Sequence, residues 1–240
     1  MYADNAIVGL QLIAFGVTYM CIDLKYRRLT AHISLYLVYF SLAYFLCKRI
    51  RPSGQATSRR RVLYTVVSML QSVSATMVST GIARARWWAR PERVWLYAGS
   101  LALGALAGCS LGMYILGMGA MGLFENHGAR AAVVISGCLS MGVVSVCLPP
   151  RMFSVCSAVL GAYTFVLGVD CFAQTGYADH LGLVTGVVER YDAGRRAVVL
   201  QAAALVLALA SALGRRACAV WRLRHELRSS SSGLSDARSY

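Results

Sequence analysis

One carboxylate stands within an apolar run, because Asp170 follows Gly168 and Val169 in the stretch of residues 152–173. A charged side chain in a hydrocarbon layer costs about 3 kcal/mol on insertion scales, and it is retained where it pairs with a cation or handles an ion or proton. Counting about 1.5 Å per residue from Met152 places Asp170 near the far end of a crossing, where water reaches it. We therefore expect a structural ion pair or helix-end anchor, with proton or ion handling as the alternative.

The cations that could pair with Asp170 are those that the connectivity brings to the same end of the bundle. Arg196 and Arg130 are the favoured partners, because each stands beside an apolar segment that begins at that end. The full set of candidates is Arg130, Arg195, Arg196 and, provided that the third apolar segment crosses the membrane, Arg61.

A stripe of hydroxyl side chains marks that third segment, residues 62–83. Spacings of three and four residues place its members on one face of a helix. Such a face is typical of a contact between membrane helices, since each hydroxyl bonds a neighbouring helix or its own i−4 carbonyl. The alternative is that the stripe lines a polar pathway. Its members are Thr65, Ser68, Ser72, Thr76 and Ser79.

Small residues recur every four positions in the fourth segment, residues 94–124, and glycines seven residues apart precede Asp170 in the sixth. Removing side chains from one face lets a second helix backbone approach closely, which is how membrane helices gain van der Waals contact. We predict glycine-zipper packing with the fourth segment central in the bundle. The packing residues are Ser100, Gly104, Gly108, Gly112, Gly161 and Gly168.

Signatures of enzymes and metal sites lack their context. The run from Gly108 to Gly112 matches G-x-S-x-G letter for letter, but it lies within an apolar helix rather than on a strand-to-helix elbow. The eight cysteines include no C-x-x-C pair, and the four histidines are dispersed. We expect no catalytic residues, no metal and no cofactor, hence no enzyme.

The elements that must position these residues are apolar helices. Hydrophobic residues make up 58% of the 240 and charged residues only 14%, which leaves little sequence for a water-soluble core. We predict an all-α polytopic transmembrane bundle, most simply of seven helices. Its apolar segments are residues 6–22, 29–47, 62–83, 94–124, 131–148, 152–173 and 197–213.

Basic residues set the orientation and the domain organisation. The formal charge of +14 lies in short loops and the tail, which argues for topology signals rather than nucleic-acid binding. The distribution of lysine and arginine over the loops fits seven crossings, with the N-terminus external or lumenal and the C-terminus cytosolic. The alternative is that the third segment lies on the membrane surface, and both termini would then be cytosolic. We expect a transmembrane domain over 1–214, a basic amphipathic segment over 215–228 and a disordered serine-rich tail over 229–240.

The residues also resemble a known family. The resemblance is to the transmembrane protein 198 and seven-transmembrane superfamily member 3 family, and it is closest to the fungal branch of that family. It is carried by the run from Ala158 to Tyr163, by the run from Leu167 to Phe172, and by the glycine-rich fourth segment that precedes them. The resemblance covers residues 6–215 and is specific over 94–176. It implies a seven-span bundle with an external N-terminus, a basic cytosolic tail and no established enzyme activity.

Two classes of function follow. The first is a non-enzymatic scaffold or adaptor in the plasma membrane or an endomembrane, embedded in the lipid bilayer and contacting anionic lipids through its tail. Protein partners or a homo-oligomer are compatible with it. The alternative is a small transporter or channel that uses Asp170 and the polar face of the third segment.

Overall fold

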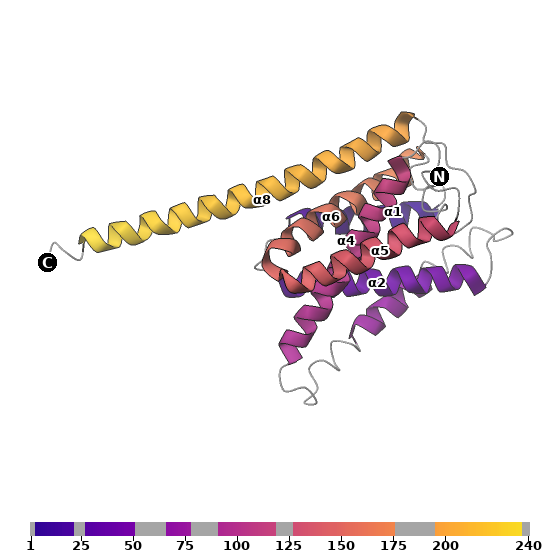
Figure 1. Cartoon of the computed structure of the whole chain (residues 1–240), viewed down its shortest axis with the longest axis horizontal. Coiled ribbons are helices and arrows are strands. Elements are labelled where there is room, and N and C mark those ends of the chain that lie inside the picture. Colours follow the sequence, from indigo (N-terminus) through magenta and orange to yellow (C-terminus); the bar gives the residue numbers. More distant parts are fainter. Residues whose placement is uncertain are drawn as a thin grey trace.

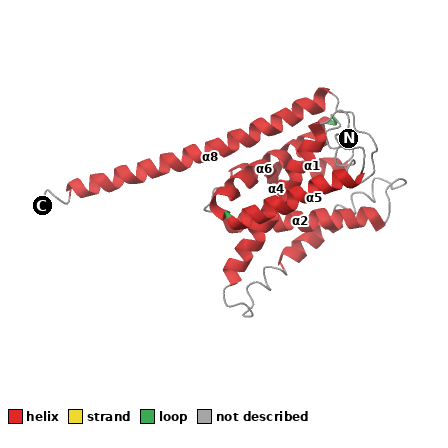
Figure 2. Cartoon of the chain, in the orientation of Figure 1, coloured by secondary structure: helices red, strands yellow, loops and turns green. Residues whose placement is uncertain are grey.

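The computed structural model of the chain describes residues 3–21, 27–50, 66–77, 91–118, 127–175 and 195–236. Among these residues all regular secondary structure is helical, and only Leu148, Gln174 and Thr175 lie outside helices, which confirms the expected helical bundle (Figure 2). The helices are α1 (Ala3–Cys21), α2 (Arg27–Ile50), a short helix over Val66–Met77, α4 (Pro91–Met118), α5 (His127–Cys147), α6 (Pro149–Ala173) and α8 (Arg195–Asp236).

Within the described residues, four helices are long and apolar enough to cross a membrane: Tyr97–Leu116, Gly128–Cys147, Met152–Ala173 and Arg195–Cys218. The shorter apolar helices are Ala6–Cys21, Leu29–Ala43 and Val66–Met77. Each of the predicted apolar segments thus contains a helix. The number of crossings stays a prediction.

A sharp corner of the bundle joins α5 to α6. Only Leu148 separates the two helices, and Pro149 and Pro150 open α6, where prolines fit because the first helical N–H groups have no intrahelical acceptor. The Met152 N–H still donates to the Leu148 carbonyl at 3.1 Å. The chain therefore reverses within one residue, which brings α6 back against α4 and α5.

Two helix pairs pack with almost no side chain between them. Along α1 and α6, Gly9 lies against Gly168 and Gly16 against Gly161; a Cβ added to Gly168 would lie 2.8 Å from the Gly9 carbonyl oxygen, and one added to Gly161 would lie 2.9 Å from that of Gly16. Along α4 and α5, Gly108 and Gly137 meet in the same way, with 2.7 Å between a Cβ on Gly137 and the Gly108 carbonyl oxygen. Backbone packs directly on backbone in both pairs.

The helices α4 and α6 lie at the centre of the bundle (Figure 1). Both contribute to the two clusters of buried apolar residues. One cluster joins Met113 of α4 to Val166 of α6, Val134 of α5 and Ala204 of α8. The other joins Leu103 of α4 to Leu160 of α6, Tyr19 of α1 and Leu37 of α2. The two pairs with glycine contacts are thereby held together.

The last helix extends far beyond the bundle (Figure 1). α8 has 42 residues, which corresponds to about 63 Å at 1.5 Å per residue. It passes Gly214 unbroken and ends at Asp236, so residues 229–236 are helical where composition predicts disorder. Extending an existing helix costs much less than nucleating a new one, and a serine-rich run can therefore follow a stable span.

The close contact of Gly108 with α5 predicts a sharp difference between two glycines of one helix pair. A Cβ on Gly108 would be far closer to the Gly137 carbonyl than real Cβ atoms come, whereas the nearest atom to a Cβ on Gly142 would be 3.8 Å away. Gly108→Ala should lower stability by about 1–3 kcal/mol through overpacking. Gly142→Ala should be neutral or slightly stabilising.

The measurement is the apparent Tm of each purified full-length variant in detergent, compared with the original chain. Equal Tm values for Gly108→Ala and Gly142→Ala would show that the α4 and α5 backbones are farther apart than described.

Candidate functional site

Asp170 lies on the last turn of α6, and its side chain is 4% exposed. The carboxylate Oδ1 accepts hydrogen bonds from the Thr175 backbone N–H at 2.9 Å and from the Thr175 hydroxyl. The Asp170 carbonyl accepts from the N–H of Gln174, which ends the helix in a left-handed conformation (φ 49°). Asp170 therefore caps the end of α6 through both its backbone and its side chain.

The candidate cations differ in burial. Arg130 near the start of α5 is 7% exposed, whereas Arg195 and Arg196 at the start of α8 are exposed. Val134, one turn after Arg130, packs in the same cluster as Leu167, one turn before Asp170, so both charged residues lie toward the same end of the bundle. Arg61 lies outside the described residues. Arg130 is thus the enclosed candidate, and the ion pair itself stays a prediction.

The polar face of the third segment is directed into the protein. Ser68 and Ser72 are fully buried, and Thr76 is half-buried. The Ser72 hydroxyl donates to the Ser68 carbonyl, and the Thr76 hydroxyl donates to the Ser72 carbonyl at 2.7 Å. Thr65 and Ser79 lie outside the described residues. These bonds stay within one helix, as serine and threonine commonly bond in apolar surroundings.

The small residues of α4 contact α5. Gly104 faces Ser145 and the Met141 carbonyl, and Gly112 faces the backbone of Val134. The Ser100 carbonyl accepts a hydrogen bond from the Ser145 hydroxyl at 2.7 Å. The α6 glycines, Gly161 and Gly168, face α1 instead. The six predicted packing residues therefore belong to two different helix contacts.

Several residues of these contacts were missed by the sequence analysis. Gly9 and Gly16 have the same spacing of seven residues as Gly161 and Gly168, which is the signal that could have paired α1 with α6. Gln11 donates to the Tyr36 hydroxyl at 2.8 Å, which links α1 to α2. No pattern in the sequence points to that contact, because a single glutamine has no periodicity.

Arg215 fastens α8 to α6. Its guanidinium donates to the Ser157 hydroxyl at 2.5 Å and to the Ser154 carbonyl at 2.7 Å. One turn earlier, the Ser211 hydroxyl donates to the Met20 carbonyl at the end of α1 at 3.1 Å. From sequence, Arg215 is only the first charge after an apolar run. In the fold it holds the last span against the bundle where α8 leaves it.

The other end of α8 is also hydrogen-bonded to the bundle. The Gln201 amide donates to the Tyr114 carbonyl of α4 at 2.7 Å, and Gln201 is 6% exposed. Among the described residues, no three His, Cys, Asp or Glu side chains lie close enough together to hold a metal ion. The polar groups described above thus serve mainly as helix caps and helix-to-helix links.

Comparison with known proteins matches one family. The family model described as "TM7S3/TM198-like domain" matches residues 9–215. The resemblance seen in the sequence is confirmed, and it extends beyond residues 94–176 to the N-terminal third. No curated protein and no solved structure match the chain.

The capping geometry predicts how substitutions of Asp170 should rank. Asp170→Asn keeps an acceptor oxygen for Thr175, whereas Asp170→Ala removes it and leaves donors unsatisfied, which costs about 1–3 kcal/mol. The apparent Tm should therefore fall more for alanine than for asparagine. Equal losses would instead indicate that the charge of Asp170, and hence an ion pair, dominates.

The contacts of Arg215 predict a local loss of stability. Arg215→Gln shortens the side chain and removes its charged donors to Ser154 and Ser157, which should cost about 1–2 kcal/mol. Arg216→Gln is the matched control, because Arg216 is the neighbouring arginine of the same helix and is exposed. Thermal unfolding of both variants tests this. A control that loses as much Tm as Arg215→Gln would contradict the fastening role.

Proposed function

We propose that this chain, which belongs to the TM7S3/TM198-like family, is a non-enzymatic membrane scaffold whose C-terminal helix presents a basic surface to partners. The observation that carries the proposal is the length of α8. Its apolar span ends at Cys218, and the helix then continues to Asp236. At 1.5 Å per residue, this extension is about 27 Å long. A rigid arm of that length is suited to holding a partner away from the membrane.

The anchoring of this arm supports the proposal. Arg215 and Ser211 bond to α6 and α1 close to where the extension begins. The position and direction of the arm are therefore fixed by the bundle. A scaffold requires such coupling, because a flexible linker would not hold a docked protein in one place.

The charge of the arm indicates the side and the kind of partner. Beyond Cys218 the helix carries three arginines, Arg222, Arg224 and Arg228, against Glu226 and Asp236, and Arg216 lies just before the end of the span. A basic segment after the last span is typical of the cytosolic side. Acidic proteins or anionic lipid headgroups are the partners that such a surface attracts.

One observation favours a transporter as a second candidate. The Gln11 side-chain carbonyl and the Ser68 hydroxyl are buried, and neither has a hydrogen-bond partner among the described residues. Buried polar atoms of this kind are usually satisfied, so water or a polar solute could complete them. A polar route past α1 and the third segment would supply both.

Removing the positive charges of the arm should impair the binding of partners without changing the stability of the bundle. The triple change Arg222→Gln, Arg224→Gln and Arg228→Gln should leave the apparent Tm unchanged, since these positions follow Cys218. It should reduce the labelling of neighbouring proteins by a proximity-labelling enzyme fused to the C-terminus. The matched control changes Arg195 and Arg196, the exposed pair at the other end of the span.

Unchanged labelling by the triple variant would contradict the scaffold. So would a purified chain that dissipates a proton or cation gradient in liposomes at a rate that Asp170→Asn lowers, because that result identifies a transporter.

A further inference from the structure

Two cysteine side chains meet where the backbones of α4 and α5 are in contact. Cys109 directly follows Gly108, and Cys138 directly follows Gly137, so each thiol lies beside one glycine of that contact. The thiols of Cys109 and Cys138 share a hydrogen bond across the interface. Both cysteines are free. Helix packing thus forms a pair of thiols from residues that are far apart in the sequence.

The same packing fixes the distance between the two cysteines. A Cβ added to Gly108 would lie 3.0 Å from the backbone nitrogen of Cys138. On one side of this point the Ser145 hydroxyl donates to the Ser100 carbonyl at 2.7 Å, and on the other side Gly112 faces the α5 backbone. A disulfide requires Cα atoms about 4.4–6.8 Å apart. Direct backbone contact between two helices provides such a separation, so the two thiols are in a position to be joined.

The surroundings of the pair decide which oxidants can reach it. Cys109 and Cys138 lie near the middle of two candidate spans, Tyr97–Leu116 and Gly128–Cys147, and both side chains are half-buried. Leu139, beside Cys138, is 65% exposed, so this part of α5 faces hydrocarbon chains in a membrane. Apolar surroundings disfavour the thiolate, which is the form that water-soluble oxidants attack. The pair therefore stays reduced until an oxidant is present in the lipid itself.

We propose that Cys109 and Cys138 are a redox modification site, which lipid hydroperoxides convert into a disulfide between α4 and α5. The first thiol attacks the peroxide: its sulfur bonds to one peroxide oxygen, the O–O bond breaks, and a sulfenic acid and a lipid alcohol form. The second thiol attacks the sulfenic sulfur, the S–S bond forms and water leaves. The two thiols together lose two electrons, and the hydroperoxide gains them.

The disulfide would clamp the central helix α4 to α5. A covalent link between two distant residues restricts the unfolded chain, and it stabilises the fold where the native geometry already suits the bond. A thiol reductant reverses the reaction, so the clamp is switchable. It depends only on the pairing of α4 with α5, and it is therefore independent of whether the chain is a scaffold or a transporter.

Peptide mapping of the oxidised chain tests the proposal. The purified full-length chain in lipid vesicles is treated with cumene hydroperoxide, which dissolves in lipid, and the remaining thiols are then blocked before digestion with trypsin. Cleavage after Arg93, Arg130 and Arg151 places the two cysteines in different peptides. These peptides should appear as a linked pair whose mass is lower than their sum by two hydrogen atoms. Reduction should separate them.

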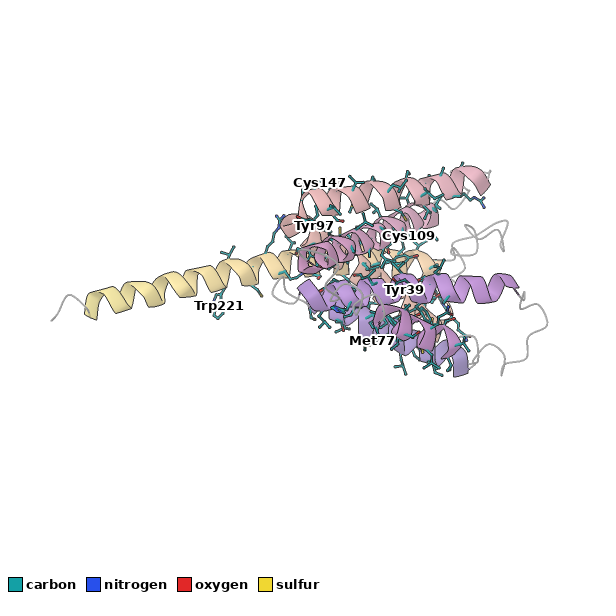
Figure 3. All side chains as sticks on the ribbon, turned by 90° about the horizontal axis from the view of Figure 1, so that it is seen from below. Tyr39, Met77, Tyr97, Cys109, Cys147 and Trp221 are labelled. Carbon is teal, nitrogen blue, oxygen red and sulfur yellow. The ribbon has the colours of Figure 1, made fainter. Side chains whose placement is uncertain are left out.

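Cys147 provides the matched control. It lies in the same tryptic peptide as Cys138, but it is exposed at the end of α5, apart from Cys109 (Figure 3). The linked pair should persist in Cys147→Ala and vanish in Cys138→Ala. The oxidised original chain should also unfold at a higher apparent Tm than the reduced chain, and Cys138→Ala should show no such rise.

Three results would overturn the proposal. The first is the absence of linked peptides from the original chain when its methionines have become sulfoxides, since that oxidation shows that the peroxide reached the protein. The second is a linked pair that persists in Cys138→Ala, which would assign the bond to Cys147. The third is an oxidised, linked chain with the same apparent Tm as the reduced chain, because the bond would then not act as a clamp.

Discussion

Direct backbone contact between helices is the constraint on which the rest of this structure depends. In lipid, apolar side chains gain little by leaving their surroundings, so helices associate where their backbones approach closely. Here Gly9 and Gly16 meet Gly168 and Gly161 across α1 and α6, and Gly108 meets Gly137 across α4 and α5. These contacts leave no room for a Cβ. They fix the position of α6, and with it the cap that Asp170 makes at its end.

Polar bonds refine this arrangement. The Ser145 hydroxyl joins α5 to α4, Gln201 joins α8 to α4, and Arg215 joins α8 to α6. Each bond reaches across a contact already made by small or apolar residues. The polar atoms of the described residues named here therefore act largely as links within the bundle.

The sequence predicts the helices better than it predicts their partners. Hydropathy locates every apolar segment, and the four-residue repeat of Gly104, Gly108 and Gly112 marks a face of close contact. The glycine repeat does not identify the helix that this face contacts, because helix pairing depends on the surfaces of both helices. The role of Arg215 was missed for the same reason. The end of α8 was missed because composition measures the polarity of residues 229–236 and takes no account of the helix that precedes them.

The most direct test of the account asks whether water reaches the polar face of the third segment. Ser68→Cys and Ser72→Cys would be treated with a charged, membrane-impermeant thiol reagent in oriented vesicles, with the exposed native Cys218 as the positive control. Cys218 should be modified, while the thiols at positions 68 and 72 should be protected from the reagent on both sides of the membrane. Modification of either position would reveal an aqueous route through the bundle and contradict the claim that its polar groups serve packing.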